Sequence, residues 1–163
     1  MLNSFFPEFY TYCKALNLAP NSIKNLKRYL SQLNDFLNAR NLVSVEQITY
    51  AHLSDFAAFN DAAPSTVKAR IWALKKFCAF LHLHDYIAVN NANGLSAPKI
   101  PKKETGFLSE DGLKIIFFYL IKNINKNNGW RNFLILTLMA VMGLRKSSVS
   151  ALDAADFDAA NNR

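Results

Sequence analysis

The sequence is poor in the residues that build turns and sheets. It has only five glycines and five prolines among 163 residues, and stretches that alternate Val, Ile or Thr with polar residues are almost absent. Such alternation marks strands, and β-rich folds need many tight turns, so this composition argues against a sheet protein. Hydrophobic residues make up 51% of the chain, which argues equally against disorder. The sequence therefore predicts an all-α fold in one or two small domains.

Long apolar runs and export signals are missing as well. The apolar segment Phe133–Leu144 is shorter than the roughly 18 to 20 residues that cross a bilayer, so we interpret it as a buried core helix. The N-terminal residues carry neither a cationic segment nor a small-residue cleavage signal, which argues against secretion. From these absences we expect a cytoplasmic protein without a membrane partner.

Cysteine and histidine are scarce and poorly placed for metal binding. Cys13 and Cys78 lie in separate helical patterns without a CxxC or Cys/His spacing, so we expect two buried thiols. His82 and His84 stand two residues apart and cannot share a helical face, a spacing that is typical of a helix end rather than of a metal pair. The sequence therefore predicts no metal site and no cofactor.

Negative charge is also in short supply. Twelve Asp and Glu residues face nineteen Lys and Arg residues, which gives a formal net charge of +7. A surplus of this size in a small protein favours a polyanionic partner such as nucleic acid. The simpler alternative is a basic surface without a partner.

Two long helical patterns carry many of the basic residues. Apolar residues recur in steps of three and four from Ile23 to Leu37 and again from Val67 to Leu81. Cations lie off both stripes, and in the second pattern a tryptophan joins them. Exposed cations of this kind make the phosphate contacts that dominate DNA affinity. The candidate DNA-binding residues on the two helices are Lys24, Lys27, Arg28, Lys68, Trp72, Lys75 and Lys76.

Two shorter helices accompany the long ones. One is expected over Leu2–Leu16, and another after Thr49, a natural N-cap. The long helices begin alike, with "APNSIK" from Ala19 and "APSTVK" from Ala63, 44 positions later. This likeness fits either two related helical hairpins or a shared helix-start chemistry in which proline occupies the first turn.

The segment Ala88–Glu104 breaks all periodicity with Asn, Pro, Gly and Lys, and it predicts a linker. Its lysines are candidates for following a phosphate backbone, although solvated linker lysines are common. They are Lys99, Lys102 and Lys103. A second helical unit is expected to begin at Ser109 as an N-cap, and it continues through the apolar segment to a short helix after Arg145.

The order of four motifs resembles the tyrosine recombinases, the family of phage integrases and Xer proteins. The start "APNSI" is similar to the family's SPNT signal, "NNANGLSAPKIPKK" to its linker, and "FLSEDG" to the opening of its catalytic domain. The segment "MGLRKSSVSALDAADFD" is similar to the one that carries the family's first catalytic arginine. The resemblance implies a four-helix, SAM-like core-binding domain over residues 1–87, a linker over 88–106 and the beginning of a catalytic domain over 107–163. It also implies double-stranded DNA as the partner, bound together with further recombinase protomers during DNA integration and recombination.

Arg145 is the residue to which the resemblance assigns chemistry. In the family this arginine stabilises a backbone phosphate while a tyrosine attacks it, and a guanidinium suits the task because it donates two hydrogen bonds to the nonbridging oxygens. The position of Arg145 alone is equally consistent with a simpler role, that of a cation that stabilises a helix C-terminus. The chain departs from the family pattern at Ser148, where glutamate is usual, and at Asn91, where proline is usual. The missing carboxylate would weaken the hydrogen bonding around the arginine.

The residues that complete the family's reaction do not follow Arg145. The lysine hairpin, the His-x-x-Arg segment and the nucleophilic tyrosine lie downstream of this arginine in the family, whereas all tyrosines and histidines of this chain precede it. We therefore expect this chain alone to be inactive as a recombinase. Three hypotheses follow: the DNA-binding portion of a longer tyrosine recombinase, a stand-alone noncatalytic DNA-binding protein, and a helical protein-interaction module without nucleic acid.

Overall fold

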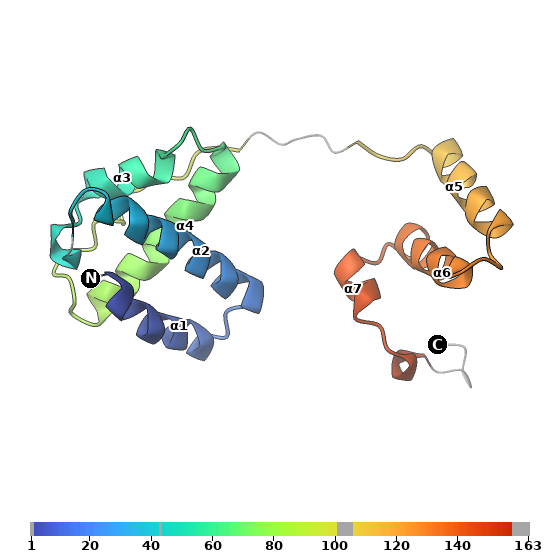
Figure 1. Ribbon diagram of the computed structural model, residues 1–163, viewed down its shortest axis with the longest axis horizontal. Coiled ribbons are helices and arrows are strands. Elements are labelled where there is room, and N and C mark those ends of the chain that lie inside the picture. Colours follow the sequence, from blue (N-terminus) through green and yellow to red (C-terminus); the bar gives the residue numbers. More distant parts are fainter. Residues whose placement is uncertain (1, 43, 101–105, 158–163) are drawn as a thin grey trace. The chain divides into compact units, whose positions relative to one another are not determined.

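The computed structural model describes residues 2–42, 44–100 and 106–157. Every regular element within these ranges is helical, as the sequence predicts (Figure 1). The chain divides into two compact units, Met1–Lys102 and Lys103–Arg163. No helix within the described ranges combines the length and the apolar character that spanning a membrane requires.

The first unit is a bundle of four α-helices with two short 3-10 turns. Its elements in chain order are a 3-10 turn at Leu2–Phe5, α1 at Phe6–Ala15, α2 at Pro20–Asn38, a 3-10 turn at Val45–Gln47, α3 at Tyr50–Ala58 and α4 at Pro64–Leu83. Figure 1 shows the two long helices, α2 and α4, crossing each other, and both are in contact with further helices of the unit. These four helices match the four that the sequence predicts.

The long helices start in the same way. Pro20 and Pro64 each occupy the first helical turn, where the N–H that proline lacks would have no partner in any case. The preceding alanines adopt nearly the same backbone conformation, with φ −54° and ψ 141° at Ala19 and φ −53° and ψ 147° at Ala63. The likeness of the two segments is therefore visible as a shared local geometry. By contrast, α3 begins with a side-chain cap, because the Thr49 hydroxyl accepts a hydrogen bond from the backbone N–H of His52 at 3.4 Å.

Large apolar side chains fill the space between the four helices. Four phenylalanines and seven leucines are fully buried there: Phe9, Phe56, Phe77, Phe80, Leu26, Leu30, Leu33, Leu37, Leu53, Leu74 and Leu81. Val67, on the predicted stripe of α4, is only partly buried. Cys13 and Cys78 are both buried free thiols, which confirms that part of the interpretation. Burial raises the pKa of Cys78 to about 12.

Arg70 is a charged residue within this core, with only 8% of its surface exposed. Its Nη1 donates hydrogen bonds to the carbonyl oxygens of Phe56, Ala57 and Phe59 at 3.2, 3.3 and 2.8 Å. These carbonyls lie at the C-terminal end of α3, where the helix dipole favours a cation and few backbone oxygens have helical partners. The Phe56 oxygen also accepts a hydrogen bond from the Phe59 N–H at 3.2 Å. Arg70 therefore joins α4 to the end of α3.

The chain packs against the bundle after α4 before it leaves the first unit. Ala92 and Leu95 fall within the segment interpreted as a linker, yet both are buried in the core. An apolar side chain can pack against the bundle even where the sequence shows no helical or strand periodicity. The side-chain amide of Asn91 donates a hydrogen bond to the carbonyl oxygen of Ile48 at 2.8 Å. Asn91, which stands where the family pattern usually has proline, thus fixes this segment to the bundle.

Within residues 106–157 the second unit contains three α-helices and a final short 3-10 turn. They are α5 at Glu110–Lys122, α6 at Gly129–Ala140, α7 at Lys146–Ser150 and a 3-10 turn at Ala154–Asp156. Ser109 caps α5 as predicted, since its hydroxyl accepts from the N–H of Gly112 at 3.1 Å. The rings of Phe117 and Phe133 meet edge to face at 5.8 Å and join α5 to α6. Gly129 is required at the start of α6, because a Cβ there would lie 2.2 Å from the carbonyl oxygen of Ile124.

The interpretation of Phe133–Leu144 as a buried core helix is wrong for this chain. α6 ends at Ala140, and the only buried residue within it is Gly129. Within the described ranges, neither α5 nor α7 has a buried residue either. The physical reason is that each of these helices has few neighbours within the described ranges: α6 packs against α5 and α7. The apolar side chains of α5 and α6 therefore stay partly or largely exposed.

Candidate nucleic-acid interface

One side of α4 carries three lysines and a tryptophan. Lys68, Trp72, Lys75 and Lys76 are all exposed, whereas the helix buries Ile71 and other apolar residues on its opposite side. Their spacing follows the helical repeat, and at 1.5 Å per residue the strip from Lys68 to Lys76 is about 12 Å long. The structure therefore brings together the four predicted residues of this helix on one exposed strip.

The predicted cations of α2 are exposed and lean on aromatic rings. The Lys27 ammonium lies 5.2 Å from the centre of the Tyr10 ring of α1. The Arg28 guanidinium lies 4.5 Å from the centre of the Tyr29 ring, and its Nη2 donates a hydrogen bond to the Tyr29 hydroxyl at 2.6 Å. Such contacts hold a cation in place through the negative face of the ring. Lys24 lies one turn before Arg28 on the same exposed side.

A hollow between the end of α1 and the start of α2 collects three lysines. It has a volume of about 580 Å³, and Lys14, Lys24 and Lys27 line it without a carboxylate among the other lining residues. Sequence reasoning missed Lys14, because it lies ten residues before Lys24 and only the turn between the helices brings the two together. A scan for cations flanking a predicted interhelical turn would have found it.

α1 connects the cations of α2 with those of α4. Burial raises the pKa of the Cys13 thiol, and the neighbouring charge of Lys76 lowers that pKa in part, so Lys76 lies near α1. Tyr10, which Lys27 contacts, stands three residues before Cys13 and therefore on the same side of α1. Burial also raises the pKa of Tyr10 to about 12. We call the exposed strip of α4, the predicted cations of α2 and Lys14 together the basic surface.

Carboxylates do not neutralise the basic surface within the described residues. The ion pairs there join Glu8 to His84 in the first unit, at 3.4 Å, and Lys114 to Glu110 and Asp111 in the second. No cation of the basic surface takes part in them. Its charges are therefore available to a polyanion.

Of the three candidate lysines in the linker, one lies within the described residues. Lys99 is exposed. Lys102 and Lys103 lie outside the described residues, so their candidacy stays a prediction.

Arg145 lies in the second unit as the residue before the first turn of α7, and its side chain is exposed. The chain turns between α6 and α7 at Gly143, whose φ of 68° is a left-handed conformation that glycine adopts without strain. The Leu144 N–H closes the turn with a hydrogen bond to the carbonyl oxygen of Leu138 at 3.1 Å. Arg145 thus follows an exposed helix and not the rigid buried one expected, and it stands at the start of α7 rather than in the last turn of α6.

A family model described as the phage integrase N-terminal SAM-like domain matches residues 7–84, the range that α1 to α4 occupy. The chain is 29% identical to the tyrosine recombinase XerD of Rickettsia prowazekii over 85% of this chain and 45% of the relative. It is 26% identical to XerC of Oceanobacillus iheyensis, over 87% of this chain and 47% of the relative. It is also 26% identical to XerC of Chlamydia trachomatis, over 97% of this chain and 56% of the relative.

The chain therefore spans about half the length of the curated relatives that it matches. No solved structure matches it significantly. The SAM-like match over the four-helix bundle agrees with the similarity to whole recombinases, which extends past the bundle into the second unit. Residues 7–84 thus match the phage integrase N-terminal SAM-like domain, and most of the chain is similar to tyrosine recombinases.

Proposed function

We propose that this chain is the DNA-binding portion of a site-specific tyrosine recombinase and that its first unit holds duplex DNA through the basic surface. The observation that carries the proposal is the gathering of exposed cations from α1, α2 and α4 without carboxylate partners among the described residues. In this proposal residues 1–87 bind DNA, 88–106 link, and 107–163 begin the catalytic domain.

The chemistry of the basic surface suits the DNA backbone more than base edges. The lysine-lined hollow offers three ammonium groups to a phosphate, and the strip on α4 offers three more along about 12 Å of helix. Lysines at such positions contribute affinity and orientation without reading sequence. Trp72 adds a flat apolar surface between them that suits the sugar edge of a strand.

Arg145 is proposed as a phosphate-stabilising residue in the longer recombinase. Its planar guanidinium suits the charge that builds on a phosphate under attack. No tyrosine follows it within these 163 residues, so strand cleavage is not expected of this chain by itself. DNA integration and recombination, assembly with further protomers and a cytoplasmic location are proposed for the longer protein.

The test is a charge reversal on α4. The triple variant Lys68→Glu, Lys75→Glu, Lys76→Glu should lose most binding to a duplex DNA fragment at low salt, because attraction to the phosphates becomes repulsion. For the unchanged chain, log K should fall with log salt at a slope of roughly −4 to −7, as expected when about 4 to 8 phosphates are neutralised. Fluorescence anisotropy of a labelled duplex measures both quantities.

A matched control carries the same change in net charge outside the basic surface. Lys122→Glu, Lys126→Glu and Arg131→Glu replace three exposed cations of the second unit. This variant should bind DNA within a few-fold of the unchanged chain. Equal losses in the two variants would mean that net charge rather than the basic surface attracts DNA. No binding by the unchanged chain at low salt would favour the helical interaction module instead.

A further inference from the structure

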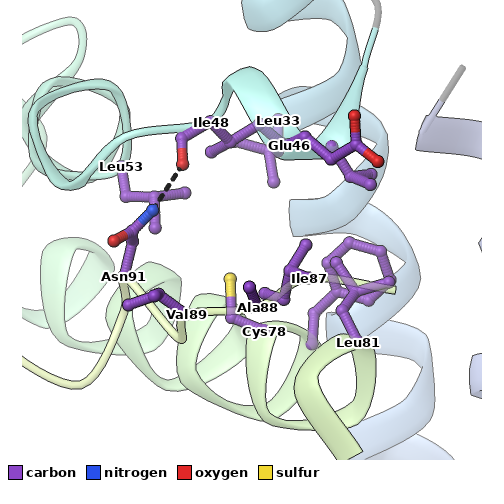
Figure 2. Close-up of a pocket in the computed structure, with 12 residues that line it drawn as sticks. Leu33, Glu46, Ile48, Leu53, Cys78, Leu81, Ile87, Ala88, Val89 and Asn91 are labelled. Carbon is purple, nitrogen blue, oxygen red and sulfur yellow. Dashed lines mark hydrogen bonds between the residues drawn. The ribbon is translucent and has the colours of Figure 1, made fainter. Parts of the chain in front are cut away.

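The first unit has a partly open cavity of about 340 Å³ on the buried side of α4. Its walls come from α2, the turn Val45–Gln47 with Ile48, α3, α4 and the segment Ile87–Asn91, which we call the strap (Figure 2). Protein interiors are close-packed and hold few voids larger than a water molecule. A space of this size beside the packed core therefore has room for a small molecule.

Most of the side chains that line the cavity are apolar. Apart from Glu46 and Asn91, every lining side chain is aliphatic, aromatic or the thiol of Cys78. The Glu46 side chain is exposed, and Figure 2 shows its carboxylate turned away from the centre of the space. A charged ligand would find no partner inside, and an anion would meet this carboxylate at the rim.

Cys78 points into the cavity. Figure 2 shows its sulfur between Ile48 and Leu33 on one side and Ile87, Ala88 and Val89 of the strap on the other. The thiol is 5% exposed, and burial raises its pKa to about 12, so it presents a neutral, polarisable surface. Such a surface favours contact with an apolar molecule.

The strap forms the thin wall of the cavity. It is anchored by the hydrogen bond from the Asn91 amide to the Ile48 carbonyl oxygen at 2.8 Å, drawn in Figure 2. At its other end the Ile87 carbonyl oxygen lies 3.1 Å from the Nδ1 of His82. Ala88 and Val89 between these anchors are exposed on their outer side. The two anchors leave this middle part as the route by which a small molecule could enter.

We propose that this cavity is a binding site for a small, uncharged, apolar molecule, such as a compound with one or two hydrocarbon rings. Ligand pockets begin at about 300 Å³, and apolar cavities of about 150 Å³ already bind benzene, so the volume suits this class. Because the strap is one wall of the cavity, the bound molecule would also hold this segment against the bundle. The site is independent of DNA binding.

Fluorobenzene is a suitable probe, because its ¹⁹F signal reports binding to the whole chain directly. The unchanged protein and Cys78→Ala, which keeps the cavity open, should shift the signal saturably. Cys78→Leu places additional side-chain volume in the cavity and should weaken binding at least about tenfold. No saturable shift with the unchanged protein would overturn the proposal, as would an unchanged affinity in a folded Cys78→Leu variant.

A second measurement decides the matter if Cys78→Leu does not fold, as judged by circular dichroism. Alkylation of the unchanged protein by iodoacetamide is followed at each cysteine by mass spectrometry. Saturating fluorobenzene should slow alkylation of Cys78 several-fold more than that of Cys13, which is also buried but does not line the cavity. Equal slowing at both cysteines, or none at Cys78, would overturn the proposal.

Discussion

The two units use similar apolar residues to very different effect. In the first, four phenylalanines and seven leucines are fully buried between crossing helices. In the second, Phe118 is 72% exposed and Trp130 is 66% exposed, although α5 and α6 are rich in apolar residues. The difference teaches that apolar composition alone does not make a core. A helix needs neighbours on several sides before its apolar side chains leave water.

This difference assigns separate physical roles to the units. The first unit can hold the basic surface in a fixed arrangement, because its helices are locked by a packed interior. The second unit rests on local contacts, such as the pair of Phe117 and Phe133, and on the cap at Ser109. Such a segment opens at a lower free energy than a packed bundle.

The largest expected effect comes from removing one phenylalanine in each unit. Phe77→Ala should lower the free energy of unfolding by about 3 to 5 kcal/mol, because Phe77 is buried among other rings. Phe118→Ala should change it by less than about 0.5 kcal/mol, since an exposed ring has little to lose. Urea unfolding measures both: Trp72 fluorescence reports the first unit when Trp130 is replaced by Phe, and Trp130 fluorescence reports the second unit when Trp72 is replaced by Phe. Equal losses would contradict the contrast between the units.

A smaller effect is expected from the buried arginine. Arg70→Met keeps the apolar stem but removes the arginine donor from the carbonyls of Ala57 and Phe59 and one of two donors from that of Phe56. It should cost about 2 to 3 kcal/mol. The matched control is Arg40→Met, because the exposed Arg40 makes one hydrogen bond, to the Phe36 carbonyl oxygen at 3.2 Å, and stacks on that ring. It should cost less than about 1 kcal/mol. The same urea titration measures the free energy of unfolding of both variants. If Arg40→Met lowered it as much as Arg70→Met, stacking on the surface would matter as much as the buried hydrogen bonds.

The smallest effect concerns alkaline pH. The pKa of Cys78 rises from its ordinary 9.0 to about 12 on burial. Below pH 9 both states hold the proton, and above it only the unfolded chain releases it, so this burial stabilises the fold fully at neutral pH and progressively less up to about pH 12. Cys78→Ala lacks this loss. The stability difference between the unchanged protein and the variant should fall by about 1 kcal/mol from about pH 8 to about pH 10.

Comparing unfolding midpoints of the two proteins removes other alkaline titrations. Tyr10, whose pKa burial also raises to about 12, is common to both proteins and cancels. A stability difference that does not change with pH would mean that the Cys78 thiol ionises in the folded state as readily as in the unfolded chain. It would also weaken the description of a closed, apolar environment around this sulfur.

Local sequence signals predicted the first unit well. Pro20, Pro64 and Thr49 mark helix starts through bonds within a few residues, so the positions of α2, α3 and α4 follow from the sequence. The same holds for Ser109 and α5. Burial in the second unit was predicted wrongly, because an apolar run shows a preference for a core and not whether other elements are present to form one.

Residues that act through distant partners escaped sequence reasoning. Arg70 reads as one more cation on a basic helix, and its burial depends on carbonyls eleven to fourteen residues away. Lys14 joins Lys24 and Lys27 only because the chain turns between α1 and α2. Five separate segments form the cavity beside Cys78, and no residue spacing in the sequence predicts it.

The aromatic supports beneath Lys27 and Arg28 have a consequence for how tightly a polyanion is held. An unrestrained lysine or arginine side chain samples many rotamers, and most of them are lost when its charged group binds a phosphate. The rings of Tyr10 and Tyr29 restrict these two side chains beforehand. In the proposed DNA complex, association would then lose less conformational entropy, so Tyr10 and Tyr29 would strengthen binding through the cations that they hold in place.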